Sequence, residues 1–302
     1  MRSFLEVDDL TPGELERVLA LSADPSPPQV LAGKGAGLVF EKPSARTRNS
    51  MEMAVVQLGG HPVYIRDEEL KIDVRESAED VIRVLAGYHD VVALRVFDHR
   101  VLDRMAGLNA VPVVNLLSDE GHPMQALADL LTIKDEFGGF EGRVIAYVGD
   151  ANNVWRSLAL GCAMVGMTSR IACPPDYGPT DVDLDRINVL GGQVEVHDRP
   201  GEAVADADVV YTDVWTSMGQ EDENEARMRA FEGFSVDERL ISGMASHGVF
   251  MHCLPAHRGE EVSHDAMESP MSRVFPQAEN RMHAARGLLA WLLGEAQGDS
   301  TT

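Results

Sequence analysis

Short apolar segments alternate with segments of helical periodicity along this 302-residue chain, and this alternation constrains its fold more than any other feature. Strands that are separated by a helix cannot pair as a hairpin, so they form parallel βαβ units. Strands are expected at 38–40, 61–65, 91–96 and 111–116, and then at 143–150, 170–173, 193–196, 209–213 and 249–253. The sequence therefore predicts an α/β fold with two parallel-sheet units that meet near Gly138-Gly139.

Some of the expected helices have recognisable first residues. Thr11 is a cap, Pro12 is the first helical residue, and Glu14 is the reciprocal partner of the cap, which predicts a helix ending near 22. Ser44 occupies the cap position before a helix over 46–58. Further helices are expected at 77–87, 98–108, 126–137, 152–165, 222–231 and 279–293. The charged segment 67–75 has no clear period and is expected to be a loop.

The composition excludes some classes of protein. The net charge of −23 opposes nucleic-acid binding, because phosphates would be repelled. Only four of the 26 basic residues are lysines, which fits either adaptation to high salt or drift in a GC-rich genome. No apolar run approaches the ~20 residues of a membrane span, and the N-terminus has no signal-peptide pattern. Three cysteines without metal spacing predict free thiols and a cytoplasmic location.

The residues from Ser44 to Arg48 predict an anion site at a strand-to-helix turn. The free N–H groups of a helix start attract anions. Two hydroxyls (Ser44, Thr47) and two guanidiniums (Arg46, Arg48) accompany them, and guanidiniums match phosphate bidentately. The alternative is a capped surface helix with solvated arginines.

Three more polar residues favour the anion site over that alternative. Arg95, His122 and Gln125 all fall at the carboxyl ends of expected strands. In a parallel sheet these ends share one rim, where ligands bind. A phosphate-binding rim is therefore expected in the first unit.

The second unit also carries polar residues at strand ends. Asn152-Asn153 follow its first strand without a G-x-G-x-x-G fingerprint, which weakens dinucleotide binding and suits a carboxylate instead. Asp213 opens a loop that continues to Gly219. Cys253 lies at a strand end between two histidines, which would favour a thiolate, whereas Cys162 and Cys173 fit inert buried thiols.

Four motifs, in this order along nearly the whole chain, resemble those of the ornithine carbamoyltransferases in the aspartate/ornithine transcarbamoylase superfamily. They are Ser44-Ala45-Arg46-Thr47-Arg48, His122-Pro123-Met124-Gln125, Asp213-Val214-Trp215-Thr216-Ser217-Met218-Gly219 and His252-Cys253-Leu254-Pro255-Ala256-His257-Arg258-Gly259. The first two belong to the wider superfamily and the last two to the ornithine branch.

The resemblance implies two α/β domains joined by two interdomain helices. A carbamoyl phosphate-binding domain would span 1–137, with the C-terminal helix 277–295 packed back onto it, and an ornithine-binding domain would span 138–276. It also implies a homotrimer, or a multiple of trimers, that makes citrulline from carbamoyl phosphate and L-ornithine without a cofactor or metal.

By position, the resemblance also implies the site residues. The carbamoyl phosphate contacts would be Ser44, Ala45, Arg46, Thr47, Arg95, His122, Gln125, Cys253, Leu254 and Arg281. The ornithine contacts would be Asn153, Asp213, Ser217 and Met218. The catalytic residues would be Arg46, Arg95, His122 and Cys253.

Two departures from the family pattern and several alternatives remain. Ala45 replaces a usual threonine, and the loop at 67–76 offers Lys71 or Asp73 where many members have a glutamine that reaches a neighbouring subunit. The acceptor could be another amine, such as putrescine or an N-acylornithine. A non-catalytic binding protein is the rival of a different class, and a nicotinamide-dependent oxidoreductase is disfavoured. The physiological direction, biosynthetic or catabolic, is left open.

Overall fold

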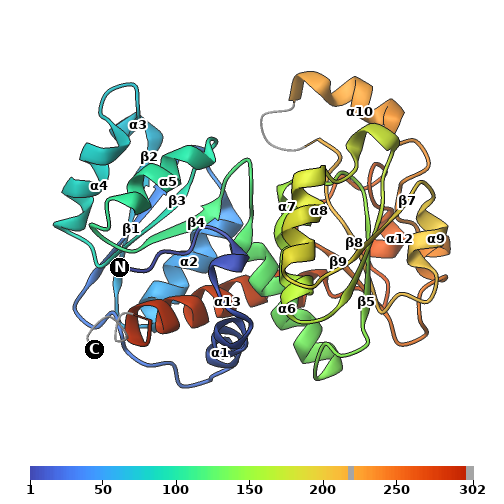
Figure 1. Cartoon of the computed structure of the whole chain (residues 1–302), viewed down its shortest axis with the longest axis horizontal. Helices are drawn as coiled ribbons and strands as arrows, with labels where there is room; N and C mark the ends of the chain where they lie inside the picture. Colours follow the sequence, from blue (N-terminus) through green and yellow to red (C-terminus); the bar gives the residue numbers. More distant parts are fainter. Residues whose placement is uncertain (217–220, 297–302) are drawn as a thin grey trace. The chain divides into compact units, whose positions relative to one another are not determined.

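The computed structural model describes residues 1–216 and 221–296, and the chain divides into two compact units (Figure 1). The first comprises Met1–Leu131 together with the chain from Glu279 onward, and the second comprises Thr132–Ala278. The chain passes from one unit to the other within two helices, α6 (Pro123–Phe137) and α13 (Val274–Gly294).

The first unit is built on a four-stranded sheet with the order β2-β1-β3-β4, in which all pairs are parallel. Its strands are β1 (Gly35–Phe40), β2 (His61–Arg66), β3 (Val91–Arg95) and β4 (Val113–Leu117). Its other helices are α1 (Pro12–Ser22), α2 (Ala45–Gln57), α3 (Asp67–Leu70), α4 (Ala78–Ala86) and α5 (His99–Gly107), with a 3-10 turn at Val7–Asp9. All five residues of β4 are buried, as is usual for parallel strands covered on both faces.

The second unit is built on a five-stranded parallel sheet with the order β7-β6-β5-β8-β9. Its strands are β5 (Val144–Val148), β6 (Thr168–Ala172), β7 (Val194–His197), β8 (Val209–Thr212) and β9 (Val249–His252). Its helices are α7 (Asn153–Met164), α8 (Asp181–Val189), α9 (Pro200–Val204), α10 (Asn224–Ala230), α11 (Glu238–Ile241) and α12 (His264–Met267), with 3-10 turns at Pro175–Tyr177 and Glu221–Glu223. Helices α7 and α8 lie on one side of this sheet, and α9 and α12 lie on the other (Figure 1).

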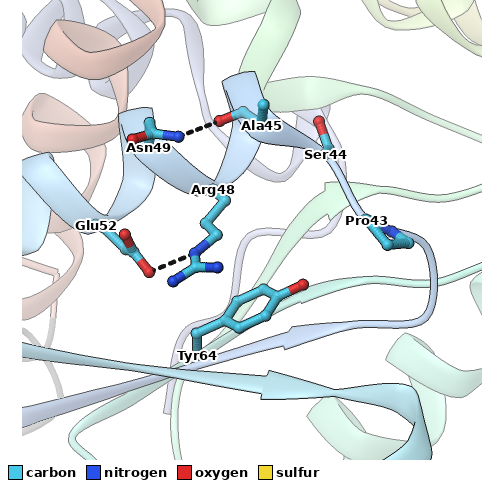
Figure 2. Close-up of a pocket in the computed structure, with 7 residues that line it drawn as sticks. All are labelled: Pro43, Ser44, Ala45, Arg48, Asn49, Glu52 and Tyr64. Carbon is cyan, nitrogen blue, oxygen red and sulfur yellow. Dashed lines mark hydrogen bonds and ion pairs between the residues drawn. The ribbon is translucent and has the colours of Figure 1, made fainter.

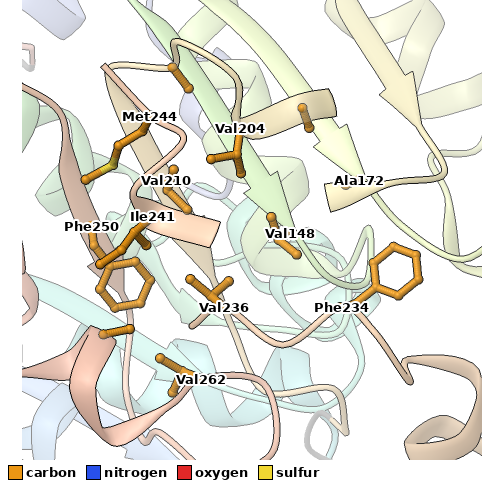
Figure 3. Close-up of a cluster of buried hydrophobic side chains, with 14 of the residues drawn as sticks. Val148, Ala172, Val204, Val210, Phe234, Val236, Ile241, Met244, Phe250 and Val262 are labelled. Atoms are coloured by element: carbon orange, nitrogen blue, oxygen red, sulfur yellow. The ribbon is translucent and has the colours of Figure 1, made fainter. Parts of the chain in front are cut away.

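The core of the second unit joins the strands to the following loops. Val148, Val210 and Phe250, from three neighbouring strands, lie in one buried cluster with Val236 and Ile241 (Figure 3). This packing holds the central strands and thereby the residues that follow their carboxyl ends. The prediction of two parallel-sheet α/β units is confirmed.

Each sheet has one point where the strand order reverses. In the first sheet β1 lies between β2 and β3, and in the second β5 lies between β6 and β8. Ligands of open α/β sheets bind outside the carboxyl ends of the strands at such a point. The residues just after β1 and β3, and those just after β5 and β8, are therefore the positions to inspect for a site.

Helix boundaries follow local chemistry in part. The prediction of the first helix is confirmed, since α1 begins at Pro12, and Thr11 and Glu14 cap each other reciprocally. Two expectations are wrong. The segment 67–75 is not all loop, because Asp67–Leu70 forms one helical turn. The last helix begins at Val274 rather than at 279, so Arg281 lies in its interior instead of at its start.

The structure also bears on the membrane question. Within 1–216 and 221–296, no helix is both long enough and apolar enough to cross a bilayer.

Candidate functional site

The N-terminus of α2 lies directly after β1, at the reversal point of the first sheet. Ser44 caps this helix, because its Oγ accepts a hydrogen bond from the backbone N–H of Thr47 at 3.4 Å. Its hydroxyl also donates to Thr47 Oγ1 at 3.1 Å. Ala45 is the first helical residue, so its backbone N–H is one of those that an α-helix leaves without an intrahelical partner.

The Thr47 hydroxyl is the point where three elements meet. Its side chain is 2% exposed. Arg281 of α13 donates to Thr47 Oγ1 from Nη2 at 2.7 Å, and Arg95 at the end of β3 donates from Nη1 at 3.5 Å. Residues that are 48 and 234 positions away in sequence are thus brought to the start of α2.

Arg46, Arg95 and Arg281 form a group of like charges that we call the arginine cluster. Burial, and then the nearby charges of Arg281 and Arg46, lower the pKa of Arg95 to about 10. The Nε of Arg46 is buried and has no hydrogen-bond partner within the described ranges. Guanidiniums that repel one another in a buried place are stabilised by an anion, and phosphate suits their geometry.

His122 and Gln125 lie beside this cluster, at and just inside the start of α6. Burial, and then the charges of Arg281, Arg95 and Arg46, hold the pKa of His122 well below its usual range, so this imidazole is neutral at physiological pH. Gln125 is 1% exposed, and its Nε2 donates to Asp129 at 2.8 Å. Its buried Oε1 has no partner among the described residues and is available to accept a hydrogen bond from a ligand N–H.

Arg48 is held by contacts other than those of the arginine cluster. It lines a pocket together with Ser44, Ala45 and Tyr64 (Figure 2). Its guanidinium carbon lies 3.9 Å from the Tyr64 ring centroid, and its Nε donates to Glu52 at 2.8 Å. Residues two apart on a helix do not share a face, which is why the neighbouring arginines separate.

The second unit carries a group that we call the thiol–carboxylate cluster: Asn152, Asp213 and Cys253. Asp213 follows β8, Asn152 follows β5, and Cys253 follows β9. Cys253 Sγ donates to Asp213 Oδ1 at 2.9 Å, and Asn152 Nδ2 donates to Asp213 Oδ2 at 3.0 Å. Both oxygens of this buried carboxylate are thus oriented at the reversal point of the second sheet.

Asn152 is a site residue that the sequence interpretation missed in favour of Asn153. Its Oδ1 caps α7 by accepting from the backbone N–H groups of Val154 and Trp155, at 2.9 and 3.1 Å. Asn153 is the first residue of that helix. The cap position itself was the available signal, since a capping asparagine keeps its Nδ2 free to donate elsewhere.

The expectation that two histidines favour a thiolate at Cys253 is wrong. His252 Nδ1 accepts from the backbone N–H of Leu254 at 2.9 Å, so the proton lies on Nε2, which donates to Glu261 at 3.1 Å. The other, His257, is held by its backbone N–H, which donates to the same carboxylate oxygen at 2.6 Å. The thiol donates to Asp213 instead, and a thiolate there would be repelled by that carboxylate.

The sequence interpretation missed Glu261, whose contacts with His252 and His257 are given above, and it also missed Arg227. Arg227 is buried, and its Nη1 donates to Asp150 Oδ2 at 2.6 Å and to the carbonyl oxygen of Trp215 at 3.1 Å. Burial raises the pKa of Asp150 despite this ion pair. Arg227 thereby ties the segment after β8 to the segment after β5. No local sequence motif predicts a contact between residues this far apart in the sequence.

Three further expected site residues are Ser217, Met218 and Leu254, and in the described ranges two groups of side chains have the types that ligate metals. Ser217 and Met218 lie outside the described residues. Leu254 follows Cys253 with a positive φ of 60°. Within the described part of the chain, two groups of side chains have metal-ligand types close together: Asp213, His252 and Cys253, and His257, Glu260 and Glu261. In the first group, both ring nitrogens of His252 already have hydrogen-bond partners.

Comparisons with known proteins agree with this arrangement of two sites in two units. Residues 2–135 match the model for the carbamoyl-P binding domain of aspartate/ornithine carbamoyltransferase, and residues 141–292 match that for its Asp/Orn binding domain. An ornithine carbamoyltransferase of Haloquadratum walsbyi is 46% identical over 297 residues, which cover 97% of this chain and 98% of the relative. One of Acidothermus cellulolyticus is 47% identical over 307 residues, with 99% and 98% covered.

A solved structure agrees as well. The ornithine carbamoyltransferase from Pyrococcus furiosus is 41% identical and superposes with a TM-score of 0.92, covering 97% of each chain. The family models together span most of this chain, and the identities far exceed what a shared fold alone would require. The chain belongs to the aspartate/ornithine carbamoyltransferase family.

Proposed function

We infer that this chain transfers the carbamoyl group of carbamoyl phosphate to the δ-amine of L-ornithine, giving L-citrulline and phosphate. The observation that carries this inference is the arginine cluster beside a neutral, buried His122 in the unit whose sequence matches a carbamoyl phosphate domain. We further propose that the reaction runs toward citrulline, as a step of arginine biosynthesis.

The donor would bind in the first unit. The N-terminus of α2, with Ser44, Ala45, Arg46 and Thr47, would hold the phosphate, and Arg281 would complete the cradle. Arg95 and neutral His122 would donate hydrogen bonds to the carbamoyl oxygen, where negative charge develops when the amine attacks. Gln125 Oε1 would accept from the carbamoyl NH₂ group. Arg46 would stabilise the charge that grows on the departing phosphate.

The acceptor would bind in the second unit. Asp213, oriented by Asn152 and Cys253, would pair with the α-ammonium of ornithine, and Asn153 would contact its amino-acid end. The nucleophile must be the neutral δ-amine, whose pKa near 10.4 makes deprotonation at pH 7 cost about 4–5 kcal/mol. Cys253 and Leu254 would lie beside this nitrogen. Because the thiol is hydrogen-bonded to a carboxylate, we assign it the role of orienting the amine and passing its proton toward Asp213.

A panel of amines tests the acceptor. Citrulline formation is measured with L-ornithine, and carbamoylation of putrescine, N-acetylornithine and L-aspartate is measured in parallel, at low and at molar salt. Turnover with ornithine alone is expected. Turnover with a different amine would keep the donor assignment and discard the acceptor assignment, and the absence of turnover with all four would favour a binding protein. Activity only at molar salt would support adaptation to salt.

Two substitutions separate the roles of the two units. Arg46→Ala is expected to abolish turnover mainly by weakening carbamoyl phosphate binding, whereas Cys253→Ala is expected to impair the use of ornithine. Arg83→Ala is the matched control, because Arg83 is exposed and pairs only with the exposed Asp80 in the contacts that the structure gives. Equal effects of both variants on both substrates would contradict the assigned roles.

Assembly and compartment form a further part of the proposal. We propose a homotrimer, which light scattering would detect as three times the chain mass of 32.9 kDa. Met53 and Val56, on the exposed face of α2, are apolar side chains that an interface would cover. We also propose a reducing, cytoplasmic location, which fits three free cysteines: thiol titration of the unfolded, unreduced protein should count three thiols.

A further inference from the structure

The loop between β4 and α6 ends at His122 and is closed by one buried hydroxyl. Ser118 is 0% exposed. Its backbone N–H donates to the carbonyl oxygen of Gly121 at 2.9 Å, and its Oγ accepts from the backbone N–H of Gly121 at 3.3 Å. Asn115 Nδ2 donates to the same Oγ at 3.2 Å, and His99 Nδ1 lies 2.7 Å from it.

His99 makes the shortest of these contacts to the Ser118 hydroxyl. Its other ring nitrogen, Nε2, faces Asp103 Oδ1 at 3.9 Å. The hydroxyl of Ser118 is therefore held by His99 from α5 and by Asn115 from β4.

We propose that Ser118 is a positioning residue for His122, and that His99 is the group that keeps its hydroxyl in place. Gly121 immediately precedes His122, so the two bonds between Ser118 and Gly121 set the direction in which the chain enters His122. The His122 carbonyl oxygen in turn accepts from the N–H groups of Gln125 and Ala126, at 2.9 and 3.2 Å. Ser118 thus acts on both carbamoyl contacts, His122 and Gln125, and this inference rests on the proposed function.

Several charged groups face His99. Asp103 lies one helical turn along α5, and Asp119 accepts from the backbone N–H of His99 at 2.9 Å. Asp98 and Arg100, on either side, form an ion pair with each other. The backbone contact with Asp119 and the ring contact with Asp103 hold His99 in place beside Ser118.

Equilibrium binding of two probes tests the proposal without turnover. Phosphonoacetamide, a stable analogue of carbamoyl phosphate, engages both the phosphate cradle and the carbamoyl contacts, whereas inorganic phosphate engages only the cradle. The measured quantity is the ratio of the two dissociation constants at pH 7.5, for the wild type and for each variant.

Three variants have distinct expected results. Ser118→Ala should weaken the analogue about tenfold, from the loss of buried hydrogen bonds, and phosphate less than about twofold. His99→Gln keeps an amide group that can hydrogen-bond to Ser118, so its analogue binding should stay near that of the wild type. His99→Ala removes this partner of Ser118 and should weaken the analogue relative to phosphate.

The control and the refuting outcomes are as follows. His61→Gln replaces an exposed histidine of the same unit and should behave as the wild type. Wild-type analogue binding in Ser118→Ala or in His99→Ala would overturn the inference while leaving the proposed function in place. No binding of the analogue to the wild type would overturn the proposed function and the inference together. If the Ser118→Ala protein does not fold, the comparison of His99→Ala with His99→Gln decides.

Discussion

Replacement of Asn152 by aspartate tests the thiol–carboxylate cluster most directly. The change is isosteric and keeps the oxygen that caps α7, but it places a second carboxylate oxygen where Nδ2 now donates to Asp213 at 3.0 Å. The lost bond is charge-assisted and contributes about 1.5–3 kcal/mol. We therefore expect kcat/KM for ornithine to fall about 10- to 100-fold, because Asp213 is no longer oriented, while binding of carbamoyl phosphate is unchanged.

The free energy of unfolding should respond as well, with a bounded magnitude. Two unit charges 3.0 Å apart at an effective dielectric constant of 20 repel by about 5–6 kcal/mol. The pair can instead bind a proton, which costs about 4 kcal/mol at pH 7 for a carboxyl of ordinary pKa. Proton uptake therefore limits the loss of stability to about 4 kcal/mol. Because the pKa of the pair is raised in the folded state, this loss shrinks as the pH falls through the raised value.

Steady-state kinetics with each substrate varied, and denaturation at pH 8 and pH 5.5, measure these effects. Asn188→Asp is the matched control, because Asn188 is an exposed residue of α8 in the same unit. Wild-type kinetics with ornithine, together with a stability loss that does not recover in acid, would refute the reasoning about Asp213 and Asn152.

Two predictions concern the stability of the first unit. Gly287→Ala should destabilise it by about 1–3 kcal/mol or more, despite a gain in helix propensity of about 1 kcal/mol, because a Cβ would lie 2.5 Å from the backbone nitrogen of Ser22. Urea titration measures the free energy of unfolding of both variants. Gly107→Ala should be neutral or stabilising, because a Cβ there would have nothing within 4 Å, and a similar loss of stability in both variants would contradict the packing argument. Burial lowers the pKa of His89, so its contribution to stability is present above the unfolded value near 6.5 and is lost as the pH falls through the lower folded value. His89→Gln should therefore reduce the drop in urea midpoint between pH 7.5 and 5.5, and an unchanged drop would assign acid sensitivity to other groups.

Features that depend on neighbouring residues in sequence were predictable from the sequence. Thr11, Pro12 and Glu14 predicted the start of α1, and Ser44 predicted the start of α2, because a capping residue contacts the backbone only two or three residues ahead. The alternation of strands and helices was sufficient for two parallel sheets, since a parallel pair requires a crossover. The strand-end positions of the polar residues followed, because all parallel strands end on one side.

Contacts between distant residues were decided only by tertiary structure. The cap position distinguished Asn152 from Asn153, but nothing local showed that the partner of Asn152 is Asp213, 61 residues away. Arg48 and Arg46 separate because residues two apart on a helix point in different directions, which the sequence already indicated. The contact of Arg48 with Tyr64 of β2 depends on tertiary packing.

The start of α13 and the partners of two histidines have the same character. Helix α13 extends back to Val274, five residues before its expected start, so that Arg281 reaches Thr47 from a helix interior. His252 and His99 contact partners on other segments, namely Glu261 and Ser118. The sequence by itself determined which residues lie at the carboxyl ends of the strands, because backbone geometry is local. Only the folded chain determined which of their atoms meet, because side-chain direction depends on packing between elements.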